Sequence, residues 1–266
     1  MSLQQHIVEQ QLPPHYYLFN TGIADADVSI FDIPFDKGDS GKVSNEPSRN
    51  TNGRGSVYFK TTNTANGNIR VVIKKYQRGG MVRHINKSLY WHRHHSESRV
   101  WHEFHLLNNM TALGLPVPTP VAGRVTRKLP QWYSSTIVTR EIEHAVTLAE
   151  KLHRSVSGNS DEELWVATGR TIKRFHDANV YHADLNASNI LIADSGDIYL
   201  IDFDKGRFRT DHRADWKQDN LQRLKRSLLK FKRGGVNRES SLAPHHGSGF
   251  RFSDDGWQLL LSGYNA

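Results

Sequence analysis

The chain contains no cysteine among its 266 residues, which excludes disulfide bonds and thiolate chemistry. No apolar run in the sequence approaches the length of about 18 residues that a membrane-spanning helix needs. Its first residues have neither the basic start nor the apolar stretch of a signal peptide, so we expect no transmembrane segment and no leader. Acidic residues are fewer than basic ones, 27 against 35, and the net charge of +8 favours anionic partners such as phosphates, nucleic acid or an anionic membrane.

The most informative segment runs from residue 181 to residue 204 and reads Y-H-A-D-L-N-A-S-N-I-L-I-A-D-S-G-D-I-Y-L-I-D-F-D. It matches the kinase catalytic-loop pattern H-x-D-L-x-x-x-N at His182, Asp184 and Asn189. The D-F-D that follows places Asp202 eighteen positions after Asp184. Apolar stretches on either side of a D-S-G-D turn predict a hairpin between the two motifs, which would bring Asp184, Asn189 and Asp202 to one site.

These residue types suit phosphoryl transfer, which needs an oriented nucleophile and a shield for the phosphate charge. Asp184 is the expected catalytic residue, since a carboxylate can orient the incoming hydroxyl and take its proton. Asn189 and Asp202 offer the hard oxygen ligands that Mg²⁺ prefers. We expect His182 to pack and hydrogen-bond within the loop instead of taking part in the chemistry.

A glycine-rich stretch, G-R-G-S-V-Y-F-K, is the candidate for the loop over the nucleotide phosphates. Gly53 and Gly55 would let the backbone approach phosphate closely, and Val57 would cover the adenine. Tyr58 replaces the third glycine of the kinase pattern, so the loop departs from that pattern at this position.

The sequence V-V-I-K, which resembles the V-A-I-K strand of kinases, ends on Lys74, and Lys75 would point to the opposite face of the strand. Helical spacing of apolar residues predicts a helix over 96–113, with Glu103 beside its apolar face as the partner of Lys74. The segment T-R-E-I is expected to be the hinge, where the backbone at Glu141 would meet the adenine edge.

Basic residues concentrate after the D-F-D segment. Lys205, Arg207 and Arg209 follow it directly, and the pattern over 215–233 predicts an amphipathic helix. The apolar residues of this helix are Leu221, Leu224, Leu228 and Phe231, and its basic residues are Lys217, Arg223, Lys225, Arg226, Lys230, Lys232 and Arg233. Such a helix can lie on an anionic membrane, or it can pack its apolar stripe on the core, and the sequence permits both.

The order of these elements predicts an α+β, bilobal, protein-kinase-like fold. The N-lobe would span residues 1–142, with the glycine loop, the lysine strand and the glutamate helix. The C-lobe would span 143–266, with a helix over 160–179, the catalytic loop and the D-F-D segment. We expect the C-terminal aromatic and leucine-rich segment to pack on the C-lobe.

The chain resembles the lipopolysaccharide-core sugar kinases, and among them those that phosphorylate 3-deoxy-D-manno-octulosonic acid (Kdo). The resemblance is carried by H-A-D-L-N-A-S-N-I-L and Y-L-I-D-F-D-K-G-R-F-R, together with Y-Q-R-G-G-M-V, E-F-H-L-L and G-L-P-V-P-T-P. It covers about residues 53–231. Ala183 replaces the arginine of H-R-D, no A-P-E follows Asp202, and Asp204 stands where kinases usually have glycine.

The resemblance implies an ATP- and Mg²⁺-dependent kinase of lipopolysaccharide inner-core biosynthesis. Its acceptor would be the 4-hydroxyl of Kdo on the Kdo–lipid A precursor. It implies a peripheral enzyme on the anionic cytoplasmic face of the inner membrane of a Gram-negative bacterium. Arg78, Arg207 and Arg209 are candidates for contact with the acceptor's carboxylate and phosphates, because arginine suits both groups.

Three alternatives stay open. A heptose kinase of the same core pathway would share these motifs. A nucleotide-binding pseudokinase would usually lack at least one of Lys74, Glu103, Asp184, Asn189 and Asp202, all of which are present. A nucleic-acid-binding protein would fit the charge, but no helix-turn-helix, zinc or stacking motif supports it, so we expect no nucleic-acid partner.

Overall fold

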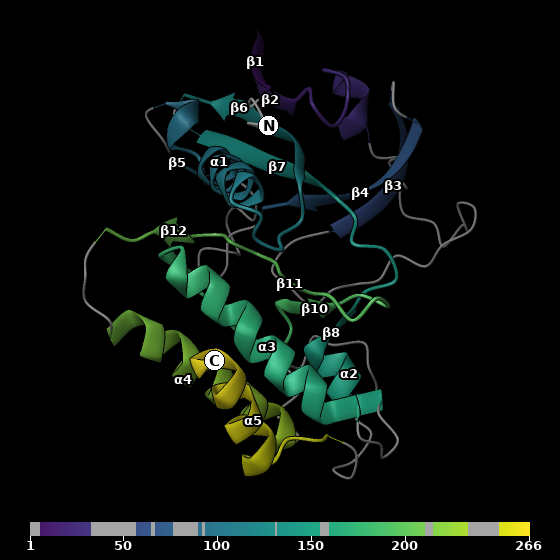
Figure 1. The fold of residues 1–266 in the computed structure, drawn as a ribbon. Coiled ribbons are helices and arrows are strands. Elements are labelled where there is room, and N and C mark those ends of the chain that lie inside the picture. The colour runs from purple at the N-terminus through teal and green to yellow at the C-terminus, as the bar shows by residue number, and fades with distance from the viewer. Residues whose placement is uncertain are drawn as a thin grey trace. The chain divides into compact units, whose positions relative to one another are not determined.

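The structure is a computed structural model that describes residues 6–32, 57–64, 67–76, 90–91, 94–130, 132–154, 160–210, 215–233 and 250–266. The chain forms two compact units (Figure 1). The first comprises Met1–His105 and Thr119–Glu141, and the second comprises Leu106–Pro118 and Ile142–Ala266. The predictions for Gly53, Gly55 and Arg78 lie outside the described residues.

The first unit is built on an antiparallel sheet with the strand order β1-β2-β6-β7-β4-β3, and a short strand, β5, also pairs with β7. The strands are β1 (Ile7–Leu12), β2 (His15–Asn20), β3 (Val57–Thr64), β4 (Gly67–Lys75), β5 (Tyr90–Trp91), β6 (Pro120–Leu129) and β7 (Trp132–Arg140). Phe19, Val71 and Ile73 bury one face of this sheet against Phe31 of the 3₁₀ helix Val28–Phe31. That packing fixes β4, the strand that carries Lys74.

Helix α1 (Arg99–Ala112) packs on the sheet through Val100 and Phe104. A Cβ atom added at Gly123 of β6 would lie 3.4 Å from Val100 Cγ2, which is ordinary van der Waals contact, so this position of the sheet lies directly beneath the helix. The helix begins three residues later than predicted because a 3₁₀ turn (His95–Glu97) precedes it.

The second unit is mainly helical, so the predicted α+β fold class is confirmed. Its helices are α2 (Leu148–Arg154), α3 (Ser160–Asp177), α4 (Asp215–Lys232) and α5 (Asp254–Asn265). Its short strands are β8 (Val146–Thr147), β9 (Val180–Tyr181), β10 (Ile190–Ile192), β11 (Ile198–Leu200) and β12 (Arg207–Phe208). The predicted hairpin is present, with β10 and β11 antiparallel and in the order β11-β10-β8.

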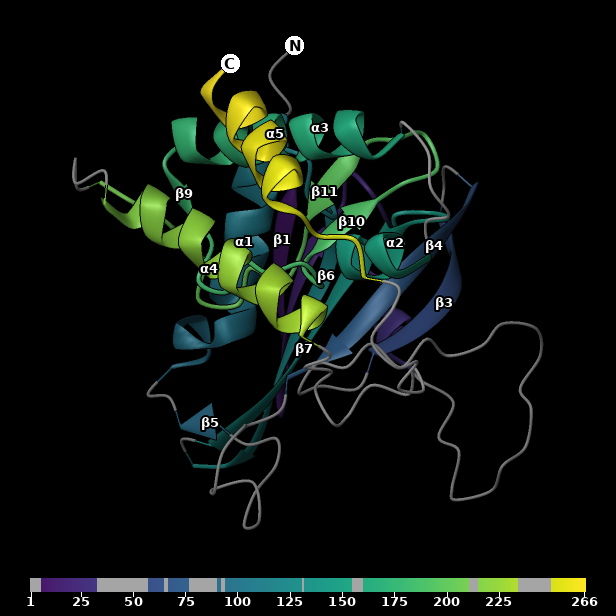
Figure 2. The same cartoon turned by 90° about the horizontal axis from the view of Figure 1, so that it is seen from below.

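The C-terminal segment packs within the second unit as expected, and it does so as a helix that the sequence analysis did not predict. Helices α3 and α5 lie side by side (Figure 1 and Figure 2). A Cβ atom would lie 2.0 Å from Leu260 O if added at Gly169, and 2.1 Å from Val166 O if added at Gly263. The two glycines therefore allow a contact between helix backbones that no larger residue would permit. None of the helices within the described ranges is long and apolar enough to cross a bilayer.

Candidate active site

Strand β4 directs Lys74 and Lys75 to opposite faces, because side chains alternate along a strand. Ile73 is buried in the sheet core, and Lys75 Nζ lies 5.3 Å from the ring centroid of Tyr58. Lys74 therefore projects from the other face. Val57 is the residue directly opposite Lys74 on β3, so the two side chains share that face.

The structure brings Lys74 and Glu103 together. Lys74 Nζ lies 3.6 Å from Glu103 Oε1, and the Glu103 side chain is only 5% exposed. The Tyr76 hydroxyl donates a hydrogen bond to Glu103 Oε2, and Lys74 Nζ lies 5.1 Å from the centroid of the Tyr76 ring. A buried carboxylate needs such partners to stay charged. Sequence reasoning missed Tyr76, although its position two residues after Lys74 places it on the same face.

Glu141 follows β7 and is fixed by Arg70 of β4. The Arg70 guanidinium donates to both carboxylate oxygens, at 2.7 Å and 3.5 Å, and the Glu141 backbone N–H donates to the Arg70 carbonyl at 2.9 Å. Because that N–H is occupied, the carbonyl oxygen is the backbone atom of Glu141 that can meet a base edge.

His182 ties the catalytic loop to the start of the D-F-D segment. Its Nδ1 accepts a hydrogen bond from the Asp184 N–H at 3.1 Å, and its Nε2 lies 2.9 Å from the carbonyl oxygen of Ile201. A carbonyl oxygen only accepts, so the ring proton sits on Nε2 and Nδ1 is unprotonated. The expectation that His182 supports the loop is confirmed.

The loop also holds Asn189 next to Asp184. Asn189 Nδ2 donates to the Asp184 carbonyl at 2.9 Å, and the Asn189 carbonyl accepts from the Ile201 N–H at 3.0 Å. Ile201 directly precedes Asp202, whose φ of 64° lies in the left-handed region that few residues other than glycine adopt. The hairpin thus returns Asp202 toward the loop that carries Asp184 and Asn189.

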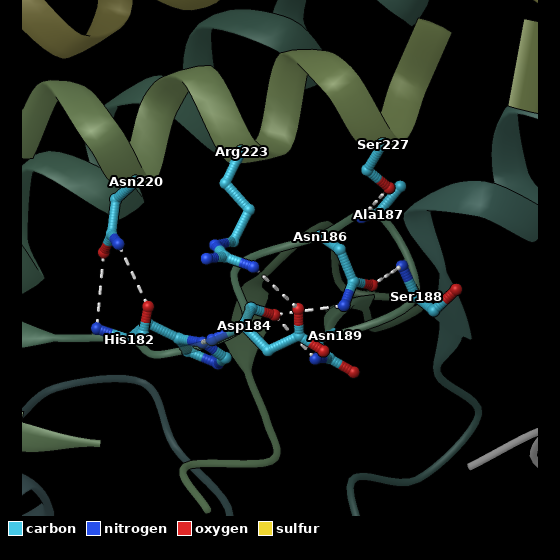
Figure 3. Close-up of polar contacts among 9 residues, drawn as sticks. All are labelled: His182, Asp184, Asn186, Ala187, Ser188, Asn189, Asn220, Arg223 and Ser227. Carbon is cyan, nitrogen blue, oxygen red and sulfur yellow. Dashed lines mark hydrogen bonds and ion pairs between the residues drawn. The ribbon is translucent and has the colours of Figure 1, made fainter. Parts of the chain in front are cut away.

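Helix α4 presents three polar side chains to the catalytic loop (Figure 3). Asn220 Oδ1 accepts from the His182 N–H at 3.3 Å, and Asn220 Nδ2 donates to the His182 carbonyl at 3.0 Å. Arg223 Nη1 lies 3.6 Å from Asp184 Oδ1. Ser227 Oγ accepts from the Ala187 N–H at 3.3 Å. Residues 220, 223 and 227 recur at helical spacing, so one face of α4 contacts the loop along its length.

Helix α4 adopts one of the two arrangements that the sequence permits. Leu221, Leu224 and Leu228 are buried, so the apolar stripe packs on the core. Arg223, which the sequence showed only as one of the basic residues of this helix, pairs with Asp184. Asn220 and Ser227 are polar residues beside the apolar stripe, but this pattern does not indicate which segment they contact.

A buried histidine lies behind Asn220. His176 of α3 is 2% exposed, and its Nδ1 is 2.7 Å from the hydroxyl of Tyr264 on α5. Burial lowers the pKa of His176 to about 4, against the opposing effect of its hydrogen bond with Asn220. His176 is therefore neutral at pH 7 and links α3, α4 and α5 beneath the loop.

The basic residues after the D-F-D segment stack on aromatic rings. The guanidinium carbon atoms of Arg207 and Arg209 lie 4.9 Å and 5.5 Å from the ring centroid of Tyr181, and Arg209 also lies over Trp216. Between them Phe208 is 36% exposed. Strand β12 and the residue after it thus present two arginines and an exposed phenyl ring.

A loop with this hydrogen-bonding pattern, carrying Asp184 and Asn189 and tied to the aspartate after a hairpin, defines a phosphotransferase of the kinase type. A buried glutamate paired with a strand lysine is the second feature of that class. The chain matches the model of a protein family described as the lipopolysaccharide kinase (Kdo/WaaP) family over residues 40–264.

Curated relatives agree with the family match. The chain is 40% identical over 180 residues to a 3-deoxy-D-manno-octulosonic acid kinase of Xylella fastidiosa (strain M23), which covers 68% of each chain. It is 33% identical over 253 residues to a kinase of the same name from Actinobacillus succinogenes, covering 94% of this chain and 95% of the relative. The solved structure of "WaaP in complex with acyl carrier protein" aligns with 79% of this chain and 77% of its own at 17% identity, with a TM-score of 0.49.

The chain belongs to the lipopolysaccharide kinase (Kdo/WaaP) family. It is therefore a kinase, as the sequence predicted.

Proposed function

We propose that this kinase transfers the γ-phosphoryl group of ATP to the 4-hydroxyl of Kdo on the Kdo–lipid A precursor, in lipopolysaccharide inner-core biosynthesis. The names of the curated relatives support Kdo as the acceptor sugar. The proposal depends above all on the exposure and the position of the Asp184 carboxylate. Its side chain is 63% exposed, while the backbone beside it is fixed by His182 and Asn189. A positioned and accessible carboxylate is what a sugar hydroxyl needs as its proton acceptor.

The first unit would supply the nucleotide contacts. Lys74 would pair with the phosphates, and Glu103 with Tyr76 would hold that lysine in place. Val57, on the same face as Lys74, would cover the adenine, and the Glu141 carbonyl would meet its edge. Gly53 and Gly55 would form the loop over the phosphates.

Asn189 and Asp202 would hold the Mg²⁺ that accompanies ATP. The amide nitrogen of Asn189 is bound to the Asp184 carbonyl, so the amide oxygen is the atom left to serve as a ligand. Two protein oxygens fit this ion, because Mg²⁺ usually keeps several waters and takes only one or two carboxylates besides the phosphates. When bound, the ion would neutralise charge on the transferred phosphoryl group.

We further propose that the enzyme acts at the anionic cytoplasmic face of the inner membrane of a Gram-negative bacterium, as a peripheral protein. Exposed Phe208 between Arg207 and Arg209 combines an apolar side chain with two cations, which suits an interface of acyl chains and phosphates. Such a contact would bring the acceptor to the enzyme while its acyl chains stay in the bilayer.

The test is transfer of labelled γ-phosphate from ATP to a Kdo-bearing lipid A precursor and, in parallel, to a heptose-bearing core. We expect label on the Kdo acceptor alone and a fall of about 10²–10⁴-fold in turnover for Asp184→Asn, the usual contribution of a general base. Circular dichroism checks that the variant is folded. Label on the heptose acceptor alone would show that the enzyme is a heptose kinase. ATP binding without transfer to either acceptor would identify a pseudokinase.

A further inference from the structure

Arg223 occupies an unusual position for a surface arginine. Its Nη1 lies 3.6 Å from Asp184 Oδ1, and the two side chains are 44% and 63% exposed. An ion pair this long and this exposed contributes about 0–1 kcal/mol to stability. The pair is therefore dispensable for folding, and the guanidinium can exchange Asp184 for another anion at little cost.

The helix holds Arg223 in register with the loop. Asn220, three residues earlier, binds the backbone of His182, and Ser227, four residues later, binds the backbone of Ala187 (Figure 3). These contacts fix the stretch of α4 from which Arg223 projects. The loop from His182 to Asn189 contains no lysine or arginine, so α4 supplies the cation beside Asp184 that the loop itself lacks.

We propose that Arg223 is the residue that recognises the carboxylate of the acceptor sugar, a role that rests on the proposed function. In an octulosonic acid the carboxyl carbon is three bonds from the carbon that bears the 4-hydroxyl. An anion of the acceptor therefore reaches the vicinity of Asp184 whenever the reacting hydroxyl does. Arginine is the side chain best suited to it, since its planar fork binds a carboxylate through two parallel hydrogen bonds.

The transfer of Arg223 from Asp184 to the sugar carboxylate would also make Asp184 available as the general base. When Arg223 moves from Asp184 Oδ1 to the sugar carboxylate, both oxygens of Asp184 are available to the hydroxyl. The hydroxyl proton passes to Asp184, the sugar oxygen forms its bond to the γ-phosphorus, and the bond from that phosphorus to the bridging oxygen of ATP breaks, releasing ADP. An acceptor without a carboxylate would leave Arg223 on Asp184 and would be a poor substrate.

The test compares Arg223→Gln with wild type on two acceptors, the Kdo-bearing precursor and its methyl ester at the Kdo carboxyl group. Loss of a charged, bidentate hydrogen bond predicts an increase of about 10- to 100-fold in KM for the free carboxylate. With the ester, Arg223→Gln should not raise KM, because the ester offers no carboxylate for the guanidinium to bind. Arg170→Gln, at an exposed helix arginine of the same unit, is the matched control and should behave as wild type with both acceptors.

Other results would overturn the assignment. Equal losses on both acceptors, or a slower hydrolysis of ATP without acceptor, would place Arg223 on the phosphoryl group instead of the carboxylate. An unchanged KM for the free carboxylate would remove the role altogether. Arg223→Lys keeps the charge without the fork and should recover only part of the affinity. If wild type transfers nothing to the Kdo acceptor, the proposed function fails before the role of Arg223 is reached.

Discussion

Asn220 is the residue whose replacement should best show how the catalytic loop is held. Its side chain is 1% exposed, and its amide satisfies both the N–H and the carbonyl of His182. Asn220→Ala leaves these two backbone groups buried without those partners, at about 1–3 kcal/mol each. We therefore expect a loss of roughly 2–6 kcal/mol in the free energy of unfolding, which lowers Tm by roughly 4–12 °C for a chain of this size.

The same change should slow the reaction, because His182 positions the Asp184 backbone. A displacement of about 1 Å can cost about 10²-fold in rate, so we expect kcat to fall about 10- to 100-fold at a temperature where the variant is folded. Thermal unfolding followed by circular dichroism and turnover with saturating ATP measure the two effects. Gln222→Ala, at the exposed position two residues later, is the control. If Asn220→Ala matched this control in both Tm and kcat, the support of the loop by α4 would be refuted.

Two further predictions concern the other buried polar groups. Tyr76→Phe removes the hydroxyl that binds Glu103, so Lys74 should be held less firmly and KM for ATP should rise several-fold, whereas Tyr58→Phe on the opposite face should leave it unchanged. Acid should destabilise the protein through His176, whose pKa falls from 6.5 in the unfolded chain to about 4 on folding. The neutral form is favoured by folding, so this contribution is fully present above pH 6.5 and is lost as pH falls toward 4, by about 3 kcal/mol at most. Urea titrations from pH 7 to pH 4 should therefore give a shallower loss of stability for His176→Gln than for wild type, and equal slopes would contradict this linkage.

The parts of the fold that rest on local patterns could be predicted from the sequence. The apolar run V-V-I before Lys74 predicted β4, and the D-S-G-D turn predicted the β10–β11 hairpin. Helical spacing located α4 within one residue of its C-terminal end. These signals are short-range, because side-chain periodicity and turn chemistry depend on neighbours in the chain. Helix α5 was missed, since three leucines in a row and two glycines hide its amphipathic period.

The contacts that position the site depend on long-range packing, and the sequence showed few of them. Asn220 lies 38 residues from the histidine it binds, and neither its type nor its spacing indicates that pairing. Arg223 was visible only as one of several basic residues on a helix, because charge patterning does not say which anion a cation meets. Tyr76 could have been found, since period 2 from Lys74 places it on the face that meets Glu103.

A series of buried polar contacts connects the C-terminal helix α5 to the catalytic loop. Tyr264 on α5 binds His176 on α3, His176 binds Asn220 on α4, and Asn220 binds the backbone of His182. Helices α5 and α3 approach so closely that Gly263 has no room for a side chain. Buried polar groups stay paired only when their partners are held at hydrogen-bonding distance, so this close helix contact stabilises the arrangement of Tyr264, His176 and Asn220 behind the loop. The support for Asp184 therefore extends through three helices to the last turn of the chain.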